Sequence, residues 1–407
     1  MRTPLDFVIT GALLDGQTTP MDIGVAAGRI AAIEPAIASD APRIEACGKL
    51  LTAGLVECHI HLDKAAILDR VTISAGTLPE AVRETAAAKA AFTVEDVYAR
   101  AAKIVEQTVL NGVVAMRSFV EIDPRAGLRS WEALKAIRAD YRHLIDIQLC
   151  AFIQEGLTNE PETEVLIRAA LEDGADLVGG CTYTDPDPAA HVARIFALAE
   201  EFGTDADFHT DFDLNPNGAH LPLIVAETRK RGFEGRVACG HVTKLAAMLP
   251  ETVDAVAREL AEAGIGVIAL PATDLFLLGR DHTHLVPRGP APLMRLRAAG
   301  APVAVATNNI LNPFTPYGDG DLMRIANLFA NVAQLSRDAD LAAAFAMVSA
   351  DAARMIGRSY GIVVGAPADL VLFDGTSPAD AVRRVASPLM GWKSGRPSFE
   401  RPAARLL

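Results

Sequence analysis

The sequence predicts an α/β protein built on a (β/α)8 barrel with a small β domain attached. Two observations support this prediction. From about residue 51 to 355, apolar runs of strand length alternate with Ala-rich stretches of helical pattern. Eight such alternations are typical of a parallel (TIM) barrel. Both ends of the chain show short β patterns instead, and 407 residues leave room for an accessory domain beside a barrel.

The first 50 residues have the pattern of short β-strands joined by tight turns. Residues 6–10 and 22–25 are strand-length runs, and Gly11, Gly16 and Gly28 punctuate this part of the chain. Glycines at such places are typical of turns between strands. We therefore expect residues 1–50 to belong to a β domain.

The middle of the chain contains the expected barrel strands. Each is a short apolar run followed by a longer helical stretch. The runs are residues 51–56, 113–116, 147–152, 175–179, 206–209, 236–239, 266–269 and 303–306. In a parallel barrel the catalytic groups lie at the carboxyl ends of such strands.

The end of the chain returns to a β pattern. Residues 365–374 begin with Gly-Ala-Pro and continue as an apolar run, which could complete the N-terminal sheet. The predicted organisation is a discontinuous accessory domain of residues 1–50 and 356–407 around a hydrolase barrel of residues 51–355.

His59 and His61 are the most informative residues of the chain. They stand one residue apart at the end of the first barrel strand, and residues i and i+2 of a strand point to the same side. Two imidazoles on one face form part of a metal site, because neutral imidazole suits zinc or iron. A catalytic site needs further ligands and an open position for water.

Other polar residues follow later barrel strands, which would bring them to the same edge of the barrel. They come from four further strand ends. They are Gln154 and Glu155, then His209, Asp211 and Asp213, then His241, and finally Asn308 and Asn309. The sequence thus predicts one site assembled from five strand ends.

Composition restricts the partners. The formal net charge is −13, so the surface should repel nucleic acid and anionic membranes, and a small neutral or cationic substrate fits better. The N-terminus lacks the apolar core of a signal peptide, and no run of about 18 uncharged apolar residues could span a bilayer. Five scattered cysteines argue against a disulfide framework. We expect a cytoplasmic protein.

These residues and their neighbours resemble the amidohydrolase superfamily, in particular its cytosine deaminase-like branch, which includes enzymes that hydrolyse isopropylammelide. The resemblance covers nearly the whole chain. The matching segments are residues 57–64, 152–156, 174–180, 208–211, 240–241 and 312–318.

The resemblance implies a fold and a set of roles. The fold is a distorted (β/α)8 barrel with a β-sandwich built from both termini, and the cofactor is one divalent metal, zinc or iron. His59, His61 and His209 would be metal ligands, and Gln154 would orient the heterocycle. His241 would hydrogen-bond the attacking water or the tetrahedral intermediate.

The chain departs from the deaminase pattern at a proton carrier. The glutamate expected three residues after the third metal histidine is replaced by Phe212. In cytosine deaminases that side chain moves protons to and from the ring. Asp211 and Asp213 are the candidates to take its place.

A second departure is Asn308, which stands where the pattern has an aspartate that is both metal ligand and general base. The asparagine carbonyl can still coordinate a metal or contact substrate, but it cannot accept a proton. His241 is the first candidate for the base. Asp319 and Asp321 are weaker candidates, because they lie well past the strand end.

The function predicted is metal-dependent hydrolysis of a carbon–nitrogen bond in a small nitrogen heterocycle, that is, deamination of a cytosine-like or triazine-like ring. A bound divalent ion lowers the pKa of water from about 16 towards about 7, and the resulting hydroxide attacks. Two alternatives stay open: a ring-opening cyclic amidohydrolase, and a barrel that binds a heterocycle without turning it over. Homo-oligomer formation is also left open by the sequence.

Overall fold

Eight parallel strands form the centre of the molecule. The computed structural model describes residues 4–402 and 406 of the chain. Each strand pairs with the next one in the sequence. They are β6 (Leu55–Ile60), β7 (Val113–Glu121), β8 (Asp146–Ile153), β9 (Leu177–Cys181), β10 (Asp205–Thr210), β11 (Val237–His241), β12 (Gly266–Ala269) and β13 (Val303–Val305). The predicted (β/α)8 barrel is confirmed.

The first and last barrel strands meet at the end that carries the histidines. A β-bridge joins Ile60 to Asn308. The Asn308 N–H donates to the His59 carbonyl, and the His61 N–H donates to the Asn308 carbonyl, each over 2.9 Å. Lower in the barrel, Glu57 accepts a hydrogen bond from the Thr307 hydroxyl over 2.6 Å. These bonds fix Asn308 beside both histidines.

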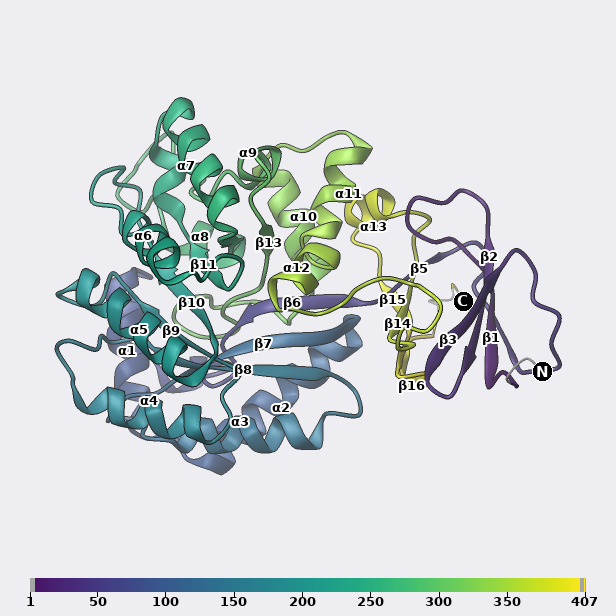
Figure 1. The fold of residues 1–407 in the computed structure, drawn as a ribbon, viewed down its shortest axis with the longest axis horizontal. Coiled ribbons are helices and arrows are strands. Elements are labelled where there is room, and N and C mark those ends of the chain that lie inside the picture. The colour runs from purple at the N-terminus through teal and green to yellow at the C-terminus, as the bar shows by residue number, and fades with distance from the viewer. Residues whose placement is uncertain (1–3, 403–405, 407) are drawn as a thin grey trace.

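Helices surround the barrel, so most strands are buried on both faces and carry nearly continuous apolar runs. Figure 1 shows these helices around the strands. They are α1 (Leu78–Lys89), α2 (Val94–Leu110), α3 (Arg129–Asp140), α4 (Glu162–Glu172), α5 (Pro188–Phe202), α6 (Leu221–Arg231), α7 (Pro250–Ala263), α8 (Pro271–Leu277), α9 (Leu293–Ala298), α10 (Leu322–Val332), α11 (Asp338–Ala346) and α12 (Ala350–Met355).

Local sequence explains where several helices begin and end. The side chains of Thr93 and Asp187 accept hydrogen bonds from the first turns of α2 and α5, which satisfies amide groups that have no partner inside the helix. Gly203, Gly232 and Gly264 end α5, α6 and α7 in the left-handed conformation, which glycine adopts without steric cost.

The accessory domain is a β-sandwich built from both ends of the chain (Figure 1). One sheet has the order β3-β2-β1-β4 and the other β16-β15-β14-β5. The strands are β1 (Phe7–Ala12), β2 (Met21–Ala26), β3 (Arg29–Glu34), β4 (Arg43–Glu45), β5 (Leu50–Thr52), β14 (Leu370–Phe373), β15 (Pro388–Lys393) and β16 (Arg396–Glu400). Apolar side chains from both sheets, including Ile9, Ile23, Leu370 and Trp392, form its core.

This arrangement corrects one expectation. The C-terminal strands do not complete the N-terminal sheet but form a second sheet, in which β14 pairs with β5 at the edge, because the sandwich needs two apolar faces to bury against each other. We propose that the barrel begins between Thr52 and Leu55. The short helix α13 (Pro378–Arg384) packs on α11 of the barrel. Residues 1–3, 403–405 and 407 of the predicted accessory domain lie outside the described residues.

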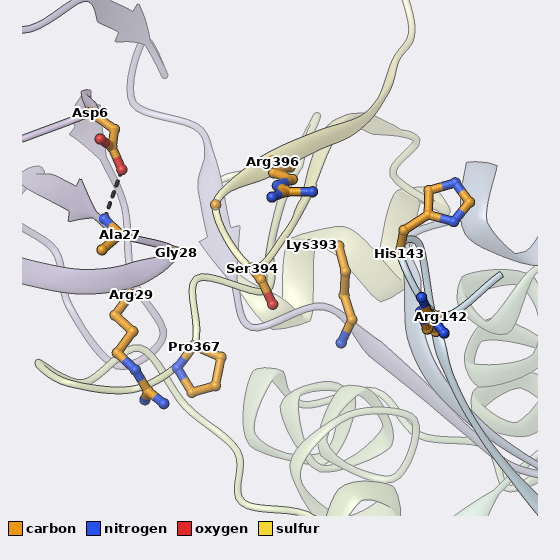
Figure 2. A pocket seen from close by; sticks show the side chains of 11 residues that line it. Asp6, Ala27, Gly28, Arg29, Arg142, His143, Pro367, Lys393, Ser394 and Arg396 are labelled. Carbon is orange, nitrogen blue, oxygen red and sulfur yellow. Dashed lines mark hydrogen bonds between the residues drawn. The ribbon is translucent and has the colours of Figure 1, made fainter. Parts of the chain in front are cut away.

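Ion pairs fasten the sandwich to the barrel. Lys393 donates to Asp369 over 2.8 Å and to Asp146, the first residue of β8, over 2.6 Å. Arg358 contacts the same two carboxylates. Figure 2 shows a cavity at this junction, around which Lys393, Arg142 and Arg396 are arranged. The junction is at the amino end of β8, whereas the catalytic groups of parallel barrels lie at carboxyl ends.

None of the helices in the described part of the chain is long and apolar enough to cross a membrane.

Candidate metal and active site

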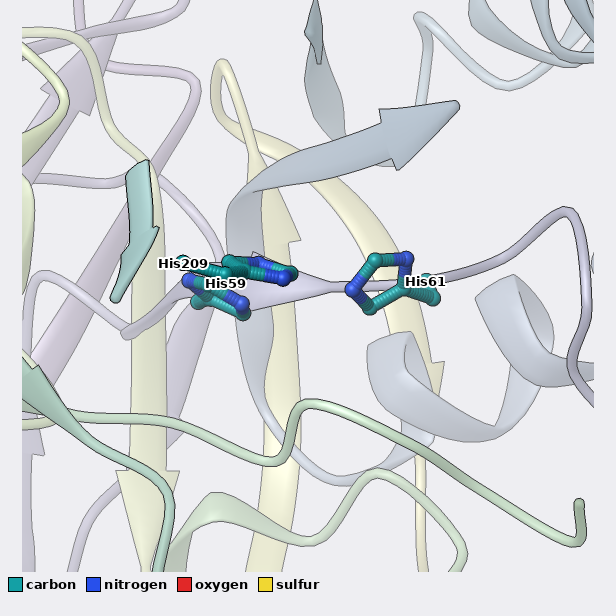
Figure 3. A group of neighbouring side chains, drawn as sticks. All are labelled: His59, His61 and His209. Atoms are coloured by element: carbon teal, nitrogen blue, oxygen red, sulfur yellow. The ribbon is translucent and has the colours of Figure 1, made fainter. Parts of the chain in front are cut away.

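Three histidines meet at the carboxyl end of the barrel. His59 and His61 project from one side of β6, and His209 comes from β10, the fourth strand away and therefore across the barrel. One ligand atom from each histidine lies within 4.8 Å of the others. The rings of His59 and His209 stack with centroids 4.5 Å apart, and His61 lies beside them (Figure 3). The structure thus brings the three predicted ligands together.

These imidazoles are buried and have nitrogen atoms without partners. Both ring nitrogens of His59, Nδ1 of His61 and Nε2 of His209 make no hydrogen bond, although buried polar groups normally do. Burial lowers the pKa of all three histidines well below the usual value, so their rings are neutral and their lone pairs are free. Three neutral imidazoles with free lone pairs fit one divalent ion such as zinc.

Asn308 offers an oxygen to the same cluster. Its Oδ1 is buried without a partner, while its Nδ2 donates to Thr273 Oγ1 over 3.2 Å. This bond fixes the orientation of the amide. The backbone of Asn308 is left-handed, with φ of 63°, which asparagine tolerates better than most residues. The Asn308 carbonyl oxygen is therefore available at the cluster, and the amide cannot accept a proton.

His241 at the end of β11 has a carboxylate partner that the sequence analysis missed. Its Nδ1 lies 2.8 Å from Asp274 Oδ1, and Asp274 Oδ2 accepts from the Leu270 N–H over 3.0 Å. Burial raises the pKa of Asp274, and the bond to His241 opposes that rise. Asp274 lies after β12, in the first turn of α8. Its position after a barrel strand is the feature of the sequence that could have marked it as a site residue.

Phe212 packs against the same imidazole. The two ring centroids are 3.9 Å apart, and Phe212 belongs to an apolar cluster with Ala81, Leu277 and Phe314. An apolar wall therefore stands where the deaminase pattern has a glutamate. Phe212 covers one side of the His241 ring, and Asp274 is the carboxylate partner of His241.

The structure does not bring Asp211 and Asp213 to the cavity. Asp211 accepts hydrogen bonds from the N–H groups of His220, over 2.7 Å, and Leu221, over 3.2 Å, so it binds the start of α6. Asp213 pairs with Lys244 over 2.7 Å and is half exposed. Asp321 caps α10 in a similar way. The carboxylates of these residues are thus engaged elsewhere.

A small cavity opens beside the three histidines. Gln154 lies in it as predicted, and its Nε2 is buried without a partner. The cavity also contains a lysine that the sequence analysis left without a role. The lining residues are His61, His209, His241 and Asn308 with Lys64, Gln154, Tyr183, Phe212, Thr273, Asn309 and Phe314.

Behind Lys64 lies a buried network of charges. Lys64 bonds Glu121, which also accepts from Lys89 over 2.9 Å. Lys89 further contacts Asp123, over 2.6 Å, and Glu155. Burial together with the neighbouring Glu121 and Asp123 carboxylates raises the pKa of Glu155 to about 7, although Lys89 opposes the rise. Glu155, predicted near the site, thus belongs to this network and does not line the cavity.

Comparison with known proteins identifies the family. The model described as "Amidohydrolase family" matches residues 143–399, which is more than half of the chain. The chain belongs to the amidohydrolase family. The resemblance predicted from the sequence is confirmed, and so is a hydrolase that acts on carbon–nitrogen bonds.

Relatives of this amidohydrolase cover nearly its whole length. It is 28% identical to the N-isopropylammelide isopropyl amidohydrolase of Pseudomonas sp. (strain ADP), over 97% of this chain and 98% of the relative. It is 29% identical to a pterin deaminase of Rhizobium rhizogenes, over 92% and 87%. The crystal structure of 5-methylcytosine deaminase from Klebsiella pneumoniae with 5-fluorocytosine matches with a TM-score of 0.93 and 29% identity, over 98% and 99%.

Proposed function

We propose that this amidohydrolase hydrolyses a carbon–nitrogen bond of a small nitrogen heterocycle and releases ammonia or an amine. The observation that carries the proposal is the cluster of His59, His61 and His209 with buried, unpartnered ring nitrogens. The relatives support the substrate class, because isopropylammelide, pterin and 5-methylcytosine are all nitrogen heterocycles.

One divalent metal would be held by these three histidines, with the Asn308 carbonyl oxygen as a fourth donor. Zinc and ferrous iron both accept neutral imidazole and an amide oxygen. When bound, such an ion supplies an electrophile and lowers the pKa of water towards about 7. Asn308 adds no charge, so three neutral histidines would provide most of the affinity.

His241 would move the protons. Asp274 holds its Nδ1, so Nε2 is the ring nitrogen left to act towards the cavity that His241 lines. That nitrogen would take a proton from the attacking water and return it to the leaving nitrogen, and the Asp274 carboxylate would stabilise the charged imidazole in between. Phe212 covers one face of the ring, which limits access of bulk water.

Gln154 and Phe314 would position the ring. Gln154 has a free amide N–H group in a buried place, which would be satisfied by an acceptor on the heterocycle. Phe314 lines the cavity as an aromatic surface. A substrate without the matching acceptor would leave the amide unpaired, and such mismatches discriminate strongly between rings.

The test is product analysis with a panel of aminated pyrimidines, triazines and pteridines on zinc-reconstituted and iron-reconstituted protein. The proposal expects ammonia or amine release from at least one ring, and loss of that release after chelation. Formation of a ring-opened acid without release of ammonia would favour a cyclic amidohydrolase. Binding without any product from metal-loaded protein would favour the heterocycle-binding barrel.

A further inference from the structure

We propose that the heterocycle is an acidic one, such as an oxo-substituted ring with an ionised N–H, and that it binds as an anion to Lys64. This inference rests on the proposed function and narrows its substrate class. It is carried by the distribution of charged groups around the cavity beside the metal cluster.

The side chains that line this cavity include one ammonium group and no carboxylate. The ammonium belongs to Lys64. The two carboxylates of the deaminase pattern are absent, because Phe212 and Asn308 occupy their places. The cavity therefore carries less negative charge than that pattern provides, even before a divalent ion is added.

Lys64 is held so that its charge is available on the cavity side. The side chain is 1% exposed, and its Nζ lies 4.2 Å from the centroid of the Phe314 ring. Glu121 binds Lys64 but does not line the cavity, and it is shared with Lys89. A buried ammonium with one shared carboxylate has donor capacity left, because it carries three N–H groups.

The carboxylates near the site do not line the cavity, and each is already bonded. Glu121, the partner of Lys64, lies 3.9 Å from His61 Nδ1. Asp63 accepts from the backbone N–H groups of Lys64, over 2.9 Å, and Glu121, over 2.8 Å. Asp274 is bonded to the His241 ring through Nδ1. Lys64 and His241 line the cavity, whereas the carboxylates bonded to them do not, and the Lys64 ammonium favours negative charge in the bound molecule.

Two amides add neutral donors. Gln154 Nε2 has no partner. Asn309 accepts from Asn312 Nδ2 over 2.8 Å through its Oδ1, and its own Nδ2 donates to no residue in the described part of the chain. An ionised oxo-heterocycle offers several acceptor atoms that share the negative charge. It would satisfy these donors and Lys64 together.

The local charges outweigh the overall charge of the chain. The net charge of −13 favours a neutral or cationic partner at long range. Charges farther away than about 8 Å are largely screened at physiological salt, whereas the Lys64 ammonium would contact the ligand directly. The acidic surface then affects the rate of encounter more than the choice of ligand.

The experiment compares two rings of the same size that carry no amino group to release. Barbiturate is an anion at pH 7.5 and uracil is neutral. Their dissociation constants are measured by calorimetry on zinc-reconstituted wild type, Lys64→Met and Lys64→Arg. Lys244→Met is the matched control, because Lys244 is a mostly buried lysine paired with Asp213 outside the cavity. Zinc content is measured for every sample.

We expect wild type and Lys244→Met to bind barbiturate roughly 10- to 100-fold more tightly than uracil, the contribution of one charged hydrogen bond. Lys64→Met should lose most of that ratio, and Lys64→Arg should keep part of it. Equal binding of both rings by wild type would overturn the inference, and so would an undiminished ratio in folded, zinc-loaded Lys64→Met. If wild type shows no preference but still releases ammonia from a neutral ring, the substrate class is wrong and the proposed function stands. If the wild-type protein binds no metal, both this inference and the proposed function are wrong.

Discussion

His241 Nδ1 lies 2.8 Å from Asp274 Oδ1, and this contact joins the end of β11 to the first turn of α8. It gives the barrel an imidazole–carboxylate pair at a place where the neighbouring wall is Phe212. Because Asn308 cannot take a proton, we propose that this pair carries the protons. Asp274 would then matter to catalysis more than any other carboxylate near the cavity.

Asp274→Asn should lower kcat by roughly 100-fold or more, with KM changed much less, since general acid–base catalysis contributes about 10²- to 10⁴-fold. The amide keeps the shape but cannot stabilise a charged imidazole. Steady-state kinetics on a substrate found in the panel measures this. Asp213→Asn is the control, because Asp213 pairs with Lys244 away from the cavity. Equal losses in the two variants would remove the special role of Asp274.

Phe212→Glu should not raise activity and should destabilise the protein. Phe212 is 3% exposed within an apolar cluster, so the change loses packing worth about 3–5 kcal/mol, the usual cost of removing a buried phenylalanine. Urea unfolding and ammonia release are the measurements. Phe212→Leu, which stays apolar, should lose less stability. A stable glutamate variant with faster turnover would show that the site lacks a proton carrier.

Asn308→Asp should tighten zinc binding by roughly tenfold or more, about 1.4 kcal/mol, because a carboxylate adds charge attraction to an oxygen that already has no partner. Competition with a chelating dye measures the affinity. Asn309→Asp adds the same charge next to it, but there Oδ1 is occupied by Asn312, so a smaller change is expected. Equal gains would mean that Asn308 is not oriented towards the metal.

Glu155→Gln should change how stability depends on pH. In the folded protein the pKa of Glu155 is raised from 4.5 to about 7. The stabilisation that protonated Glu155 adds to the free energy of unfolding is therefore fully present below pH 4.5, and it is lost as pH rises through 7. The loss amounts to about 3 kcal/mol. Urea unfolding at pH 5 and pH 8 measures this. The free energy of unfolding should decrease less between the two pH values in the glutamine variant than in wild type. Parallel decreases would contradict the buried, crowded environment of Glu155.

The barrel was predictable because its signal is local. Strand-length apolar runs such as 147–152 and 266–269 fall inside β8 and β12, and alternation along one strand placed His59 and His61 on the same side. His209 and His241 could be found because each lies at the carboxyl end of an apolar strand-length run. The pairing of the C-terminal strands with β5 was not predicted, since it joins segments more than 300 residues apart.

The different surroundings of Asp211 and Asp274 were not predictable, because they depend on contacts between elements. Asp211 and Asp274 both follow barrel strands, but the left-handed backbone at Asp211, with φ of 54°, accompanies its bonds to the start of α6. Asp274 faces His241, 33 residues away. No local pattern distinguishes the two aspartates, because the difference arises only when the strands are assembled.

Metal content is the decisive measurement for the three-histidine site. Elemental mass spectrometry of protein purified without chelators and reconstituted with zinc or iron should find about one metal per chain in wild type, and much less in folded His59→Ala. His143→Ala should bind as much metal as wild type, because His143 is exposed and far along the chain from the cluster. No metal in wild type after reconstitution, or equal metal in His59→Ala, would contradict a three-histidine metal site and the hydrolysis built on it.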